Sequence, residues 1–338
     1  MGSNHMLHDS DETIQGAAGT TPAVSAKLVK GRAGLSAARK LANILSAALN
    51  TTQARVMLKK ILKRLEKRGS LSREQNHAWL QSNHQDFATL AVAIDPDLWS
   101  ESQQFGQELR SRATAVLSRL DVNLSGGGYY PMLYFVTRWA KPDCIVETGV
   151  AAGYSSQAFL MAIRRNGTGR LHSSDFPLFR LPDPRRFIGI LVEETLREGW
   201  DLHVNGDEAN LPVILSRIQQ VDVFHYDSDK SYSGRAHAMS LITERMSHQG
   251  LIIMDDVQDN SFFFDYITNN NISEFSIFDF ENKYIGLIGS LVRPQSSTLE
   301  RRSVRGEVSG GSPYGDPDWS SDSPNSDSMI TPSSKPHE

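Results

Sequence analysis

An apolar run that ends in an acid, a glycine-rich turn and the first turn of a helix follow one another in residues 144–156, with the sequence CIVETGVAAGYSS. This order predicts a buried parallel strand, a tight loop and a helix whose free N–H groups face whatever the loop holds. The acid is Glu147, and the two glycines are Gly149 and Gly153. A dinucleotide-binding loop needs Gly-x-Gly-x-x-Gly, and residues 150–152 supply no middle glycine in that register, so the loop argues against NAD.

Short apolar segments alternate with amphipathic ones from Asp143 onward, which is typical of a parallel sheet covered by helices on both faces. We expect five parallel strands, closed by an antiparallel hairpin whose turn is Glu281–Lys283. A further helix ends near Ala140, ahead of the first strand. The expected strands are 144–148, 170–174, 201–205, 221–226, 250–255, 275–280 and 284–292, and the expected helices among them are 154–165, 186–198, 208–219, 232–247 and 261–268.

Residues 24–69 are rich in Ala, Leu, Lys and Arg, and 74–125 continues helical, so 24–125 is predicted to be a basic helical region. Over 24–73 there are thirteen Lys or Arg residues and one acid, Glu66. Two helices are expected, at 36–49 and 52–68, and the second has an apolar stripe surrounded by basic residues. Such a stripe is usually a packing face, but a partner helix, a homo-oligomer contact or an anionic surface would also fit it.

Composition limits what the other segments can be. Residues 1–23 and 294–338 are polar and lack periodicity, so both are predicted to be disordered, which leaves 126–293 as one α/β domain. The net charge of −4 makes no global demand for nucleic acid. A single cysteine, Cys144, excludes an internal disulfide and suits a reducing, cytoplasmic compartment. No apolar run approaches the about 20 residues that a membrane-spanning helix needs, so we expect no transmembrane segment.

The ends of the second and third strands each carry an aspartate. Ligands of an open parallel sheet bind at the carboxyl ends of its strands. Asp175 follows the second strand, where a carboxylate can accept both ribose hydroxyls of a nucleoside. A turn or helix-capping aspartate is the alternative for this position. Asp207 follows the third strand and can equally be the N-cap of the next helix.

Four carboxylates follow the fourth and fifth strands: Asp227, Asp229, Asp255 and Asp256. Carboxylates this close repel one another unless a cation neutralises them, and oxygen-only ligands suit Mg²⁺, Ca²⁺ or Mn²⁺. The alternative needs no metal, because one aspartate can cap a helix while another contacts an amino group of the ligand. His225 is expected to be an interior side chain, so the two histidines of a non-heme iron site are not found here.

The glycine loop resembles motif I of the class I S-adenosylmethionine (SAM)-dependent methyltransferases, in which a strand-terminal acid and the loop hold the cofactor. Five parallel strands closed by a hairpin also resemble the seven-stranded, Rossmann-like sheet of that family. The resemblance covers about residues 126–293 and implies that the end of the third strand contacts the adenine. The implied cofactor-binding residues are Glu147, Gly149, Gly153, Ser155, Asp175, Asp207 and Asp227.

The acidic cluster looks like that of the metal-dependent branch of small-molecule and sugar O-methyltransferases, which pairs Asp-x-Asp after the fourth strand with Asp-Asp after the fifth. This resemblance implies Asp227, Asp255 and Asp256 as ligands of Mg²⁺ or another divalent cation, and Asp229 as the base. The sequence that begins at Asp227, Asp-Ser-Asp-Lys-Ser-Tyr, also resembles a bacterial-type group that usually reads Asp-x-Asp-His-Ser-Tyr. Lys230 stands in place of that histidine and becomes a second candidate base.

These residues predict a SAM-dependent methyltransferase that methylates a hydroxyl of a small molecule or a sugar with the help of a divalent cation. A neutral hydroxyl is a poor nucleophile, and a divalent cation lowers its pKa and orients its lone pair toward the methyl group. A nearby carboxylate or lysine then accepts the proton. Tyr129, Tyr130 and Tyr232 are candidates for the wall of the acceptor pocket, although aromatic packing would also account for them.

Two other functions stay open. An RNA-directed methyltransferase would use the basic helices, but enzymes that act on nucleic-acid bases commonly have Asn/Asp-Pro-Pro-aromatic after the fourth strand, where this chain has Tyr-Asp-Ser-Asp. A non-catalytic SAM-binding or scaffold protein would be marked by a broken cofactor site, and the expected residues of that site are intact. We therefore expect a small-molecule acceptor rather than nucleic acid.

Overall fold

The computed structural model describes residues 66, 69–120, 122, 124, 127–177 and 183–292. The expected disordered ends, 1–23 and 294–338, lie outside this part of the chain. So do the expected helix Ser36–Leu49 and nearly all of Thr52–Arg68, and with them the expectation of a homo-oligomer contact. Among the described helices, none is long and apolar enough to cross a membrane.

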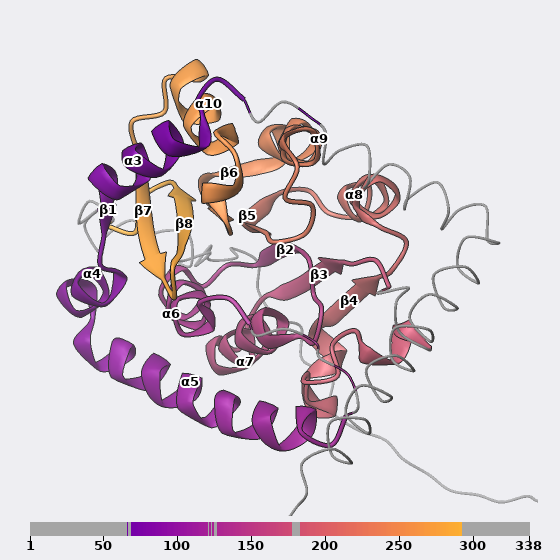
Figure 1. Ribbon diagram of the computed structural model, residues 1–338. Coiled ribbons are helices and arrows are strands. Elements are labelled where there is room, and N and C mark those ends of the chain that lie inside the picture. The colour runs from indigo at the N-terminus through magenta and orange to yellow at the C-terminus, as the bar shows by residue number, and fades with distance from the viewer. Residues whose placement is uncertain are drawn as a thin grey trace, which may run out of the picture. The chain divides into compact units, whose positions relative to one another are not determined.

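One mixed sheet of eight strands forms the centre of the fold, in the order β1-β7-β8-β6-β5-β2-β3-β4 (Figure 1). All neighbouring strands are parallel except β8, which runs antiparallel to β6 and β7. The expected α/β class and the terminal hairpin are confirmed, with eight strands in place of seven because β1, two residues long, pairs with β7. The strands are β1 (His84–Gln85), β2 (Cys144–Thr148), β3 (Arg170–Ser174), β4 (Trp200–His203), β5 (Val221–Tyr226), β6 (Met246–Met254), β7 (Phe275–Phe280) and β8 (Lys283–Ile288).

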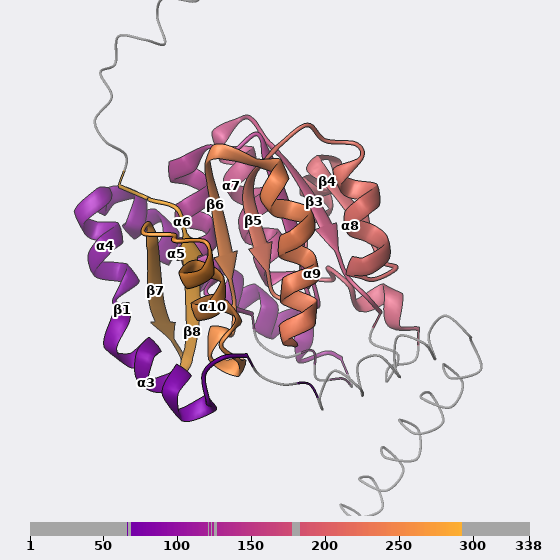
Figure 2. The ribbon, with the colours of Figure 1, turned by 90° about the horizontal axis from the view of Figure 1, so that it is seen from above.

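Helices cover both faces of the sheet: α6 and α7 lie on one face with α5 outside them, and α8, α9 and α10 lie on the other (Figures 1 and 2). Capping signals in the sequence account for several starts, since Asp95 caps α5 just ahead of a proline and Ser72 forms a capping box with Gln75. The helices are α3 (Arg73–Asn83), α4 (Phe87–Ile94), α5 (Pro96–Leu117), α6 (Tyr130–Ala140), α7 (Tyr154–Asn166), α8 (Asp207–Leu215), α9 (Tyr232–Ile242) and α10 (Phe262–Asn269), with 3₁₀ turns η1 (Pro184–Phe187), η2 (Glu194–Gly199), η3 (Thr243–Arg245) and η4 (Val257–Asp259).

An apolar layer packs against each face of the sheet, as the alternation of side chains along a strand requires. In β2, Ile145 joins the layer of α5, α6 and α7, whereas its neighbour Val146 joins the layer of α8, α9 and α10. Both side chains are fully buried. Cys144, which begins the same strand, is half-buried and free, and burial raises the pKa of its thiol to about 12. The thiol therefore stays protonated and behaves as the small apolar side chain that its place in the strand implies.

The helix expected over 186–198 is replaced by η1, an irregular segment and η2. Gly189 has a φ of +66° and interrupts the helical backbone. Its N–H and the N–H of Leu191 donate to the carbonyl oxygens of residues 151 and 152, each at 2.9 Å. The backbone of this segment therefore pairs with the glycine-rich loop after β2 instead of forming helical turns, which periodicity in the sequence does not reveal.

The N-terminal helices pack into the same core as the sheet. Phe87, the first residue of α4, is fully buried and makes edge-to-face contacts with four rings, at centroid distances between 5.0 and 5.7 Å. These rings belong to Trp99, Tyr129, Phe135 and Phe278, from α5, α6 and its N-cap, and β7. One side chain thus joins the helices before residue 125 to the α/β part of the chain, although the boundary at 125/126 stays a prediction.

We expect Phe87→Ala to destabilise the whole described fold, because the cavity opens where α4, α5, α6 and β7 meet. The expected loss is about 3–5 kcal/mol in the free energy of unfolding, measured by urea denaturation. Val92→Ala, in the same helix at a side chain that is 49% exposed, is the control and should cost less than about 0.5 kcal/mol. An early transition in Phe87→Ala, followed by a second one at the wild-type midpoint, would show instead that these helices unfold separately.

Candidate active site at the carboxyl ends of the strands

The carboxyl ends of β2, β3 and β5 meet in the middle of the sheet, and backbone hydrogen bonds continue past them. The N–H of Gly149 donates to the oxygen of Ser174 at 2.8 Å, and the N–H of Asp227 donates to the oxygen of Thr148 at 3.0 Å. The glycine loop leaves β2 between these ends, because β3 lies on one side of β2 and β5 on the other. Open α/β sheets bind their ligands at such a switch point.

Both glycines of the loop have backbones that a larger residue would displace. Gly149 has a φ of +87°, and a Cβ there would lie 2.2 Å from the carbonyl oxygen of Asp227. Gly153 has a φ of +95°, and a Cβ there would lie 2.8 Å from the Cα of Gly189. Gly153 is also the N-cap of α7. The loop is therefore close-packed on both sides, with the N-terminus of α7 directly after it.

Glu147, the strand-terminal acid, is completely buried beneath the loop. Its carboxylate accepts hydrogen bonds from the hydroxyls of Ser155, of Ser156 at 2.6 Å and of Ser173 at 2.8 Å. The carboxylate thus ties the end of β2 to the first turn of α7 and to β3. In the structure, Glu147 and Ser155 hold the loop in shape, and a direct contact of either side chain with a cofactor stays a prediction.

His225 is an interior side chain, as expected, and its ring packs edge-on against Phe159. Its Nδ1 lies 3.8 Å from Oε1 of Glu147 and has no hydrogen-bond partner among the described residues. His225 lies on β5, in register with Glu147 of β2. It is not among the side chains whose ligand atoms cluster at the ends of β5 and β6.

Asp175 lies directly beside the glycine loop. Its Oδ2 accepts the N–H of Ala151 at 2.8 Å, and its Oδ1 accepts the N–H of Phe176 at 2.6 Å. Burial raises the pKa of this carboxyl to about 6, although the two N–H groups act in the opposite direction. Each carboxylate oxygen can accept a further hydrogen bond, which leaves the group able to bind hydroxyls of a ligand.

Asp207 begins α8, and the alternative reading of this residue as the N-cap is wrong. The N-cap is Gly206, whose φ of +88° favours glycine. The Asp207 carboxylate accepts a hydrogen bond from Ser174 Oγ at 2.6 Å and another from the hydroxyl of Ser228. It therefore connects the ends of β3 and β5 through two serines.

Asn210 was not expected from the sequence and is the buried link among the strand ends on this side. It is 2% exposed, and its Nδ2 donates to Ser174 Oγ at 2.9 Å and to the carbonyl of His203 at 3.0 Å. Its Oδ1 accepts the N–H of Asn205 at 3.1 Å. The one signal in the sequence is an amide beside the apolar residues of the first turns of α8, which by itself indicates only burial.

Three of the four expected carboxylates come together at the ends of β5 and β6. Asp227, Asp255 and Asp256 each offer one oxygen, and these atoms lie within 4.8 Å of one another. The N–H of Asp255 donates to the carbonyl of Tyr226 at 2.9 Å, which keeps the two strand ends level. Asp256 has a φ of +53°, and this left-handed backbone lets two successive carboxylates reach one cluster.

Asp229, the fourth carboxylate, lies against the start of α9. Its Oδ1 accepts the N–H of Ser231 at 3.0 Å. Gly234 of the same helix comes so close that a Cβ there would lie 2.6 Å from the Asp229 Cγ. This side chain therefore shapes the helix start and is not among the three clustered oxygens.

Two lysines offset part of the negative charge of the carboxylate cluster in the structure. Lys230 Nζ contacts Asp227 and lies 2.9 Å from Asp256 Oδ2, and Lys283 Nζ lies 3.2 Å from Asp256 Oδ1. Lys283 begins β8 and reaches the cluster because β8 is the neighbour of β6. The sequence offered no local sign of this contact, since it depends on the strand order.

The charges of the cluster move the pKa values of its members in different directions. Burial, followed by repulsion from Asp227, raises the pKa of Asp255 to about 6. Burial acts in the same direction on Asp256, but the ammonium groups of Lys230 and Lys283 outweigh it and lower that pKa to about 2. Burial alone would lower the pKa of Lys230, yet the surrounding carboxylates raise it above its ordinary value. The carboxylates of the cluster therefore favour the positively charged form of a lysine beside them.

Aromatic packing accounts for the three tyrosines that were candidates for an acceptor wall. Their ring partners are Phe280 for Tyr129 at 4.2 Å, Tyr154 for Tyr130 at 5.4 Å and Phe262 for Tyr232 at 5.2 Å. Two successive glycines lie between one of these pairs and the cluster. A Cβ at Gly127 would lie 2.5 Å from Tyr154, and a Cβ at the next residue, Gly128, would lie 3.4 Å from Asp255 Oδ2.

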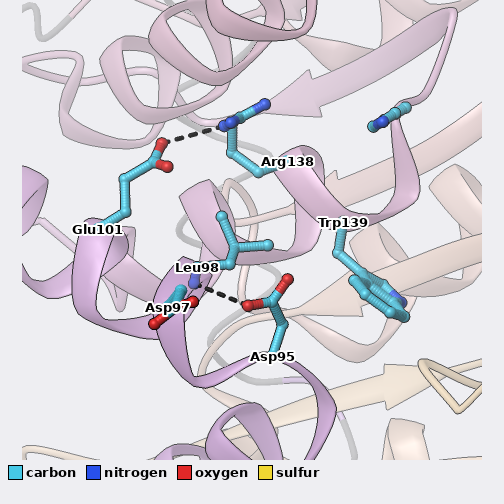
Figure 3. A pocket seen from close by; sticks show the side chains of 7 residues that line it. Asp95, Asp97, Leu98, Glu101, Arg138 and Trp139 are labelled. Atoms are coloured by element: carbon cyan, nitrogen blue, oxygen red, sulfur yellow. Dashed lines mark hydrogen bonds and ion pairs between the residues drawn. The ribbon is translucent and has the colours of Figure 1, made fainter.

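A pocket between α5 and α6 is separate from this cluster (Figure 3). It includes Lys141, which precedes the amino end of β2, whereas the cluster follows the carboxyl ends of β5 and β6. Two of its acids are already engaged, because Asp95 caps α5 and Glu101 accepts a hydrogen bond from Arg138 at 3.1 Å. We assign this pocket no part in the site.

Comparisons with known proteins point to the same part of the chain. Residues 146–257 match the model of a family described as a methyltransferase domain, and a search of curated proteins finds no match. Similar solved structures include the O-methyltransferase TomG from Streptomyces achromogenes, in complex with SAM (14% identity, 54% of this chain and 89% of that chain, TM-score 0.43). Another is the O-methyltransferase from Bacillus cereus in complex with S-adenosylhomocysteine (SAH) (15% identity, 57% of this chain and 91% of that chain, TM-score 0.41).

The family match begins within β2 and ends just after the Asp255–Asp256 pair, so it spans the glycine loop and all three clustered carboxylates. This part of the chain therefore matches a methyltransferase domain.

The raised pKa of Asp175 predicts a pH-dependent affinity for SAH. If the ionised carboxylate accepts the ribose hydroxyls, a pKa of about 6 makes SAH bind about tenfold more weakly at pH 5 than at pH 7, measured by calorimetric titration. Asp175→Asn should bind SAH weakly at both values. Equal pH dependence in the variant would exclude this role.

The raised pKa of Asp175 also makes the stability of the fold depend on pH. Because folding raises the pKa of Asp175 from 3.8 to about 6, the ligand-free fold loses stability as the pH rises from about 4 to 6. Asp175→Asn should lack this loss, which thermal unfolding at several pH values measures.

Proposed function

We propose that the protein transfers the methyl group of SAM to a hydroxyl of a small molecule or a sugar, with a divalent cation held by Asp227, Asp255 and Asp256. Three carboxylates come within 4.8 Å of one another at the ends of β5 and β6, beside the glycine loop. This convergence carries the proposal. Close carboxylates repel one another, and a divalent cation held by all three would remove that repulsion.

The cofactor half of the site is built on the ends of β2, β3 and β4. In the proposal, Asp175 accepts the ribose hydroxyls and Asp207 lies at the adenine end. Gly149 and Gly153 let the loop backbone approach the amino-acid part of the cofactor, and the first N–H groups of α7 attract its carboxylate. Glu147 and Ser155 support this half by holding the loop, as their mutual hydrogen bond indicates.

The donor set of the other half fits a hard divalent cation. It consists of carboxylate oxygens alone, which suits Mg²⁺, Mn²⁺ or Ca²⁺ rather than zinc or copper. Lys230 and Lys283 mark the same place as one that attracts positive charge. Asp227, Asp255 and Asp256 would be the protein ligands, and the two ammonium groups would give up these contacts.

The chemistry divides between the bound groups and the chain. SAM supplies a methyl group on a positively charged sulfur, and the cation supplies Lewis acidity that lowers the pKa of a bound hydroxyl. The acceptor oxygen forms the new C–O bond as the C–S bond breaks with its electrons to sulfur, which leaves SAH. The three aspartates orient the acceptor, and a residue of the chain accepts its proton.

We assign the proton-accepting role to Lys230 rather than Asp229. Lys230 Nζ lies at the cluster, whereas Asp229 is committed to the start of α9. Lys230 is an ammonium beside the free carboxylates. A divalent cation on the same carboxylates removes the attraction that keeps it protonated, so the amine becomes a base only in the loaded site.

The two alternative functions gain no support from the described residues. The basic segment that an RNA-directed enzyme would use lies outside them, and the small-molecule acceptor remains our proposal. A non-catalytic scaffold would lack the loop geometry, but Gly149 and Gly153 both have the positive φ values of a close-packed glycine loop.

The proposal is tested by titrating the purified full-length chain with SAH by calorimetry and with Mn²⁺ by electron paramagnetic resonance. We expect Asp255→Asn to lose at least about tenfold in Mn²⁺ affinity, since it removes one ligand charge, while SAH affinity changes little. Asp222→Asn is the matched control, because Asp222 lies near the start of β5 and accepts the N–H groups of Asp143 and Cys144. A wild-type chain that binds SAH but no Mn²⁺ would exclude the cation and leave the methyltransferase.

Lys230→Met and Asp229→Asn separate the two candidate bases. With methyl-labelled SAM and a panel of phenols and sugars as acceptors, Lys230→Met should lower kcat by about 10²–10⁴-fold without loss of SAH affinity, because general-base catalysis has that magnitude. Asp229→Asn should keep most of kcat and most of the stability, because the asparagine oxygen can still accept the N–H of Ser231. The opposite pattern would assign the proton to Asp229.

A further inference from the structure

The turn Asp255–Asn260 joins β6 to α10 and carries two of the three clustered carboxylates. Its backbone is irregular, because Asp256 has a φ of +53° and the next three residues form the 3₁₀ turn η4. A left-handed backbone costs a residue other than glycine about 1–2 kcal/mol. Such a turn keeps its shape only where the surrounding structure holds it.

Arg235, from α9, holds the first half of this turn. It is completely buried, and its Nη2 donates to the carbonyl oxygens of Asp255 at 3.1 Å and of Asp256 at 2.8 Å. Its guanidinium also lies over the ring of Tyr226, 5.9 Å from the centroid. Both bonds go to the backbone, so they fix the direction of the peptide groups from which the two carboxylates project.

Asn76, from α3, holds the second half of the same turn. It is 2% exposed, and its Nδ2 donates to the carbonyl oxygens of Val257 and Asn260, each at 3.1 Å. Asn260 in turn donates from its own Nδ2 to the carbonyl of Lys230 at 2.8 Å. Hydrogen bonds thus connect α3, which lies outside the residues of the family match, through Asn260 to the backbone of Lys230.

Stability alone does not account for Arg235. Its Nε and Nη1 have no hydrogen-bond partner among the described residues, although the side chain is completely buried. A buried guanidinium with unpartnered nitrogens costs stability, and an apolar side chain of similar volume is often at least as stable in such a place. A residue that is costly for the fold, and is bonded to the backbone of two site aspartates, indicates a role in the site.

We propose that Arg235 and Asn76 are positioning residues of the cation and acceptor half of the site. They hold the Asp255–Asn260 turn from within the protein, so that Asp255, Asp256 and Lys230 keep the relative places that a cation and a hydroxyl acceptor require. This inference rests on the proposed function, and it makes α3 a working part of the methyltransferase site.

The matched control is Asn210, the buried amide of the cofactor half. Both asparagines are 2% exposed, and each donates to backbone carbonyls at the carboxyl ends of strands or just after them. Asn76→Leu and Asn210→Leu are therefore the same chemical change on the two sides of the site. A general loss of stability would weaken Mn²⁺ binding and SAH binding alike in both variants. Positioning would weaken only Mn²⁺ binding in Asn76→Leu and only SAH binding in Asn210→Leu.

The experiment measures Mn²⁺ affinity by electron paramagnetic resonance and SAH affinity by calorimetry on the full-length wild type, Asn76→Leu, Arg235→Met and Asn210→Leu. Loss of a group that orients a ligand costs about 10–100-fold in metal affinity. We expect this loss in Asn76→Leu and Arg235→Met, with SAH affinity within about threefold of wild type. Asn210→Leu should weaken SAH binding and leave Mn²⁺ binding in place.

Unchanged Mn²⁺ affinity in folded Asn76→Leu and Arg235→Met, or equal losses for both ligands, would overturn the inference while the proposed cation site stands. A wild type that binds no Mn²⁺ would overturn both, and its SAH affinity would still report on the methyltransferase function separately. Should Arg235→Met not fold, Arg235→Lys serves in its place, because lysine keeps the charge but not the guanidinium geometry. Wild-type Mn²⁺ affinity in that variant would equally overturn the role of Arg235.

Discussion

Repulsion among the three carboxylates at the ends of β5 and β6 is the constraint on which the rest of this site depends. Groups whose oxygens lie within 4.8 Å must be neutralised, and the fold brings Lys230 from the loop before α9 and Lys283 from the terminal hairpin to do so. The two aspartates that follow β6 differ because of this arrangement, since Asp256 contacts both ammonium groups while Asp255 is buried next to Asp227. Strand order, rather than local sequence, decides which charges meet.

The cofactor side is built differently, because its acids are held by hydroxyl and N–H groups rather than by ammonium groups. Glu147 is surrounded by serine hydroxyls, and Asn210 joins three segments at the ends of β3 and β4. Buried polar groups that are fully bonded in this way rigidify the backbone around them. One end of the sheet therefore carries a hydrogen-bonded half, which we propose for a nucleoside, and a charged half, which we propose for a cation and an acceptor, with β2 and β5 as their common border.

The sequence was sufficient wherever a local pattern determines the structure. The ranges expected for β2, β3, β5 and β7 agree with the structure, and the strand ends led directly to Asp227, Asp255 and Asp256. It was insufficient where partners lie far apart in the chain. The segment after β3 looked helical because its hydrogen bonds to the glycine loop are invisible in its own periodicity, and β1 is too short to have any pattern. Arg235 looks like an exposed residue of an amphipathic helix, and only the packing of α9 on the turn after β6 reveals its bonds.

Gly149 has a consequence that extends beyond its own loop. A Cβ on Gly149 would lie 2.2 Å from the carbonyl oxygen of Asp227, so the loop and the end of β5 are in close backbone contact at this point. Engineering a different acceptor preference by moving Asp227 would therefore disturb cofactor binding at the same time. The hairpin turn 281–283 reaches the cluster through Lys283 of β8, a strand that does not neighbour β2 in the sheet. A change in this turn would therefore act on the carboxylate cluster and leave the strand that carries the glycine loop as it is.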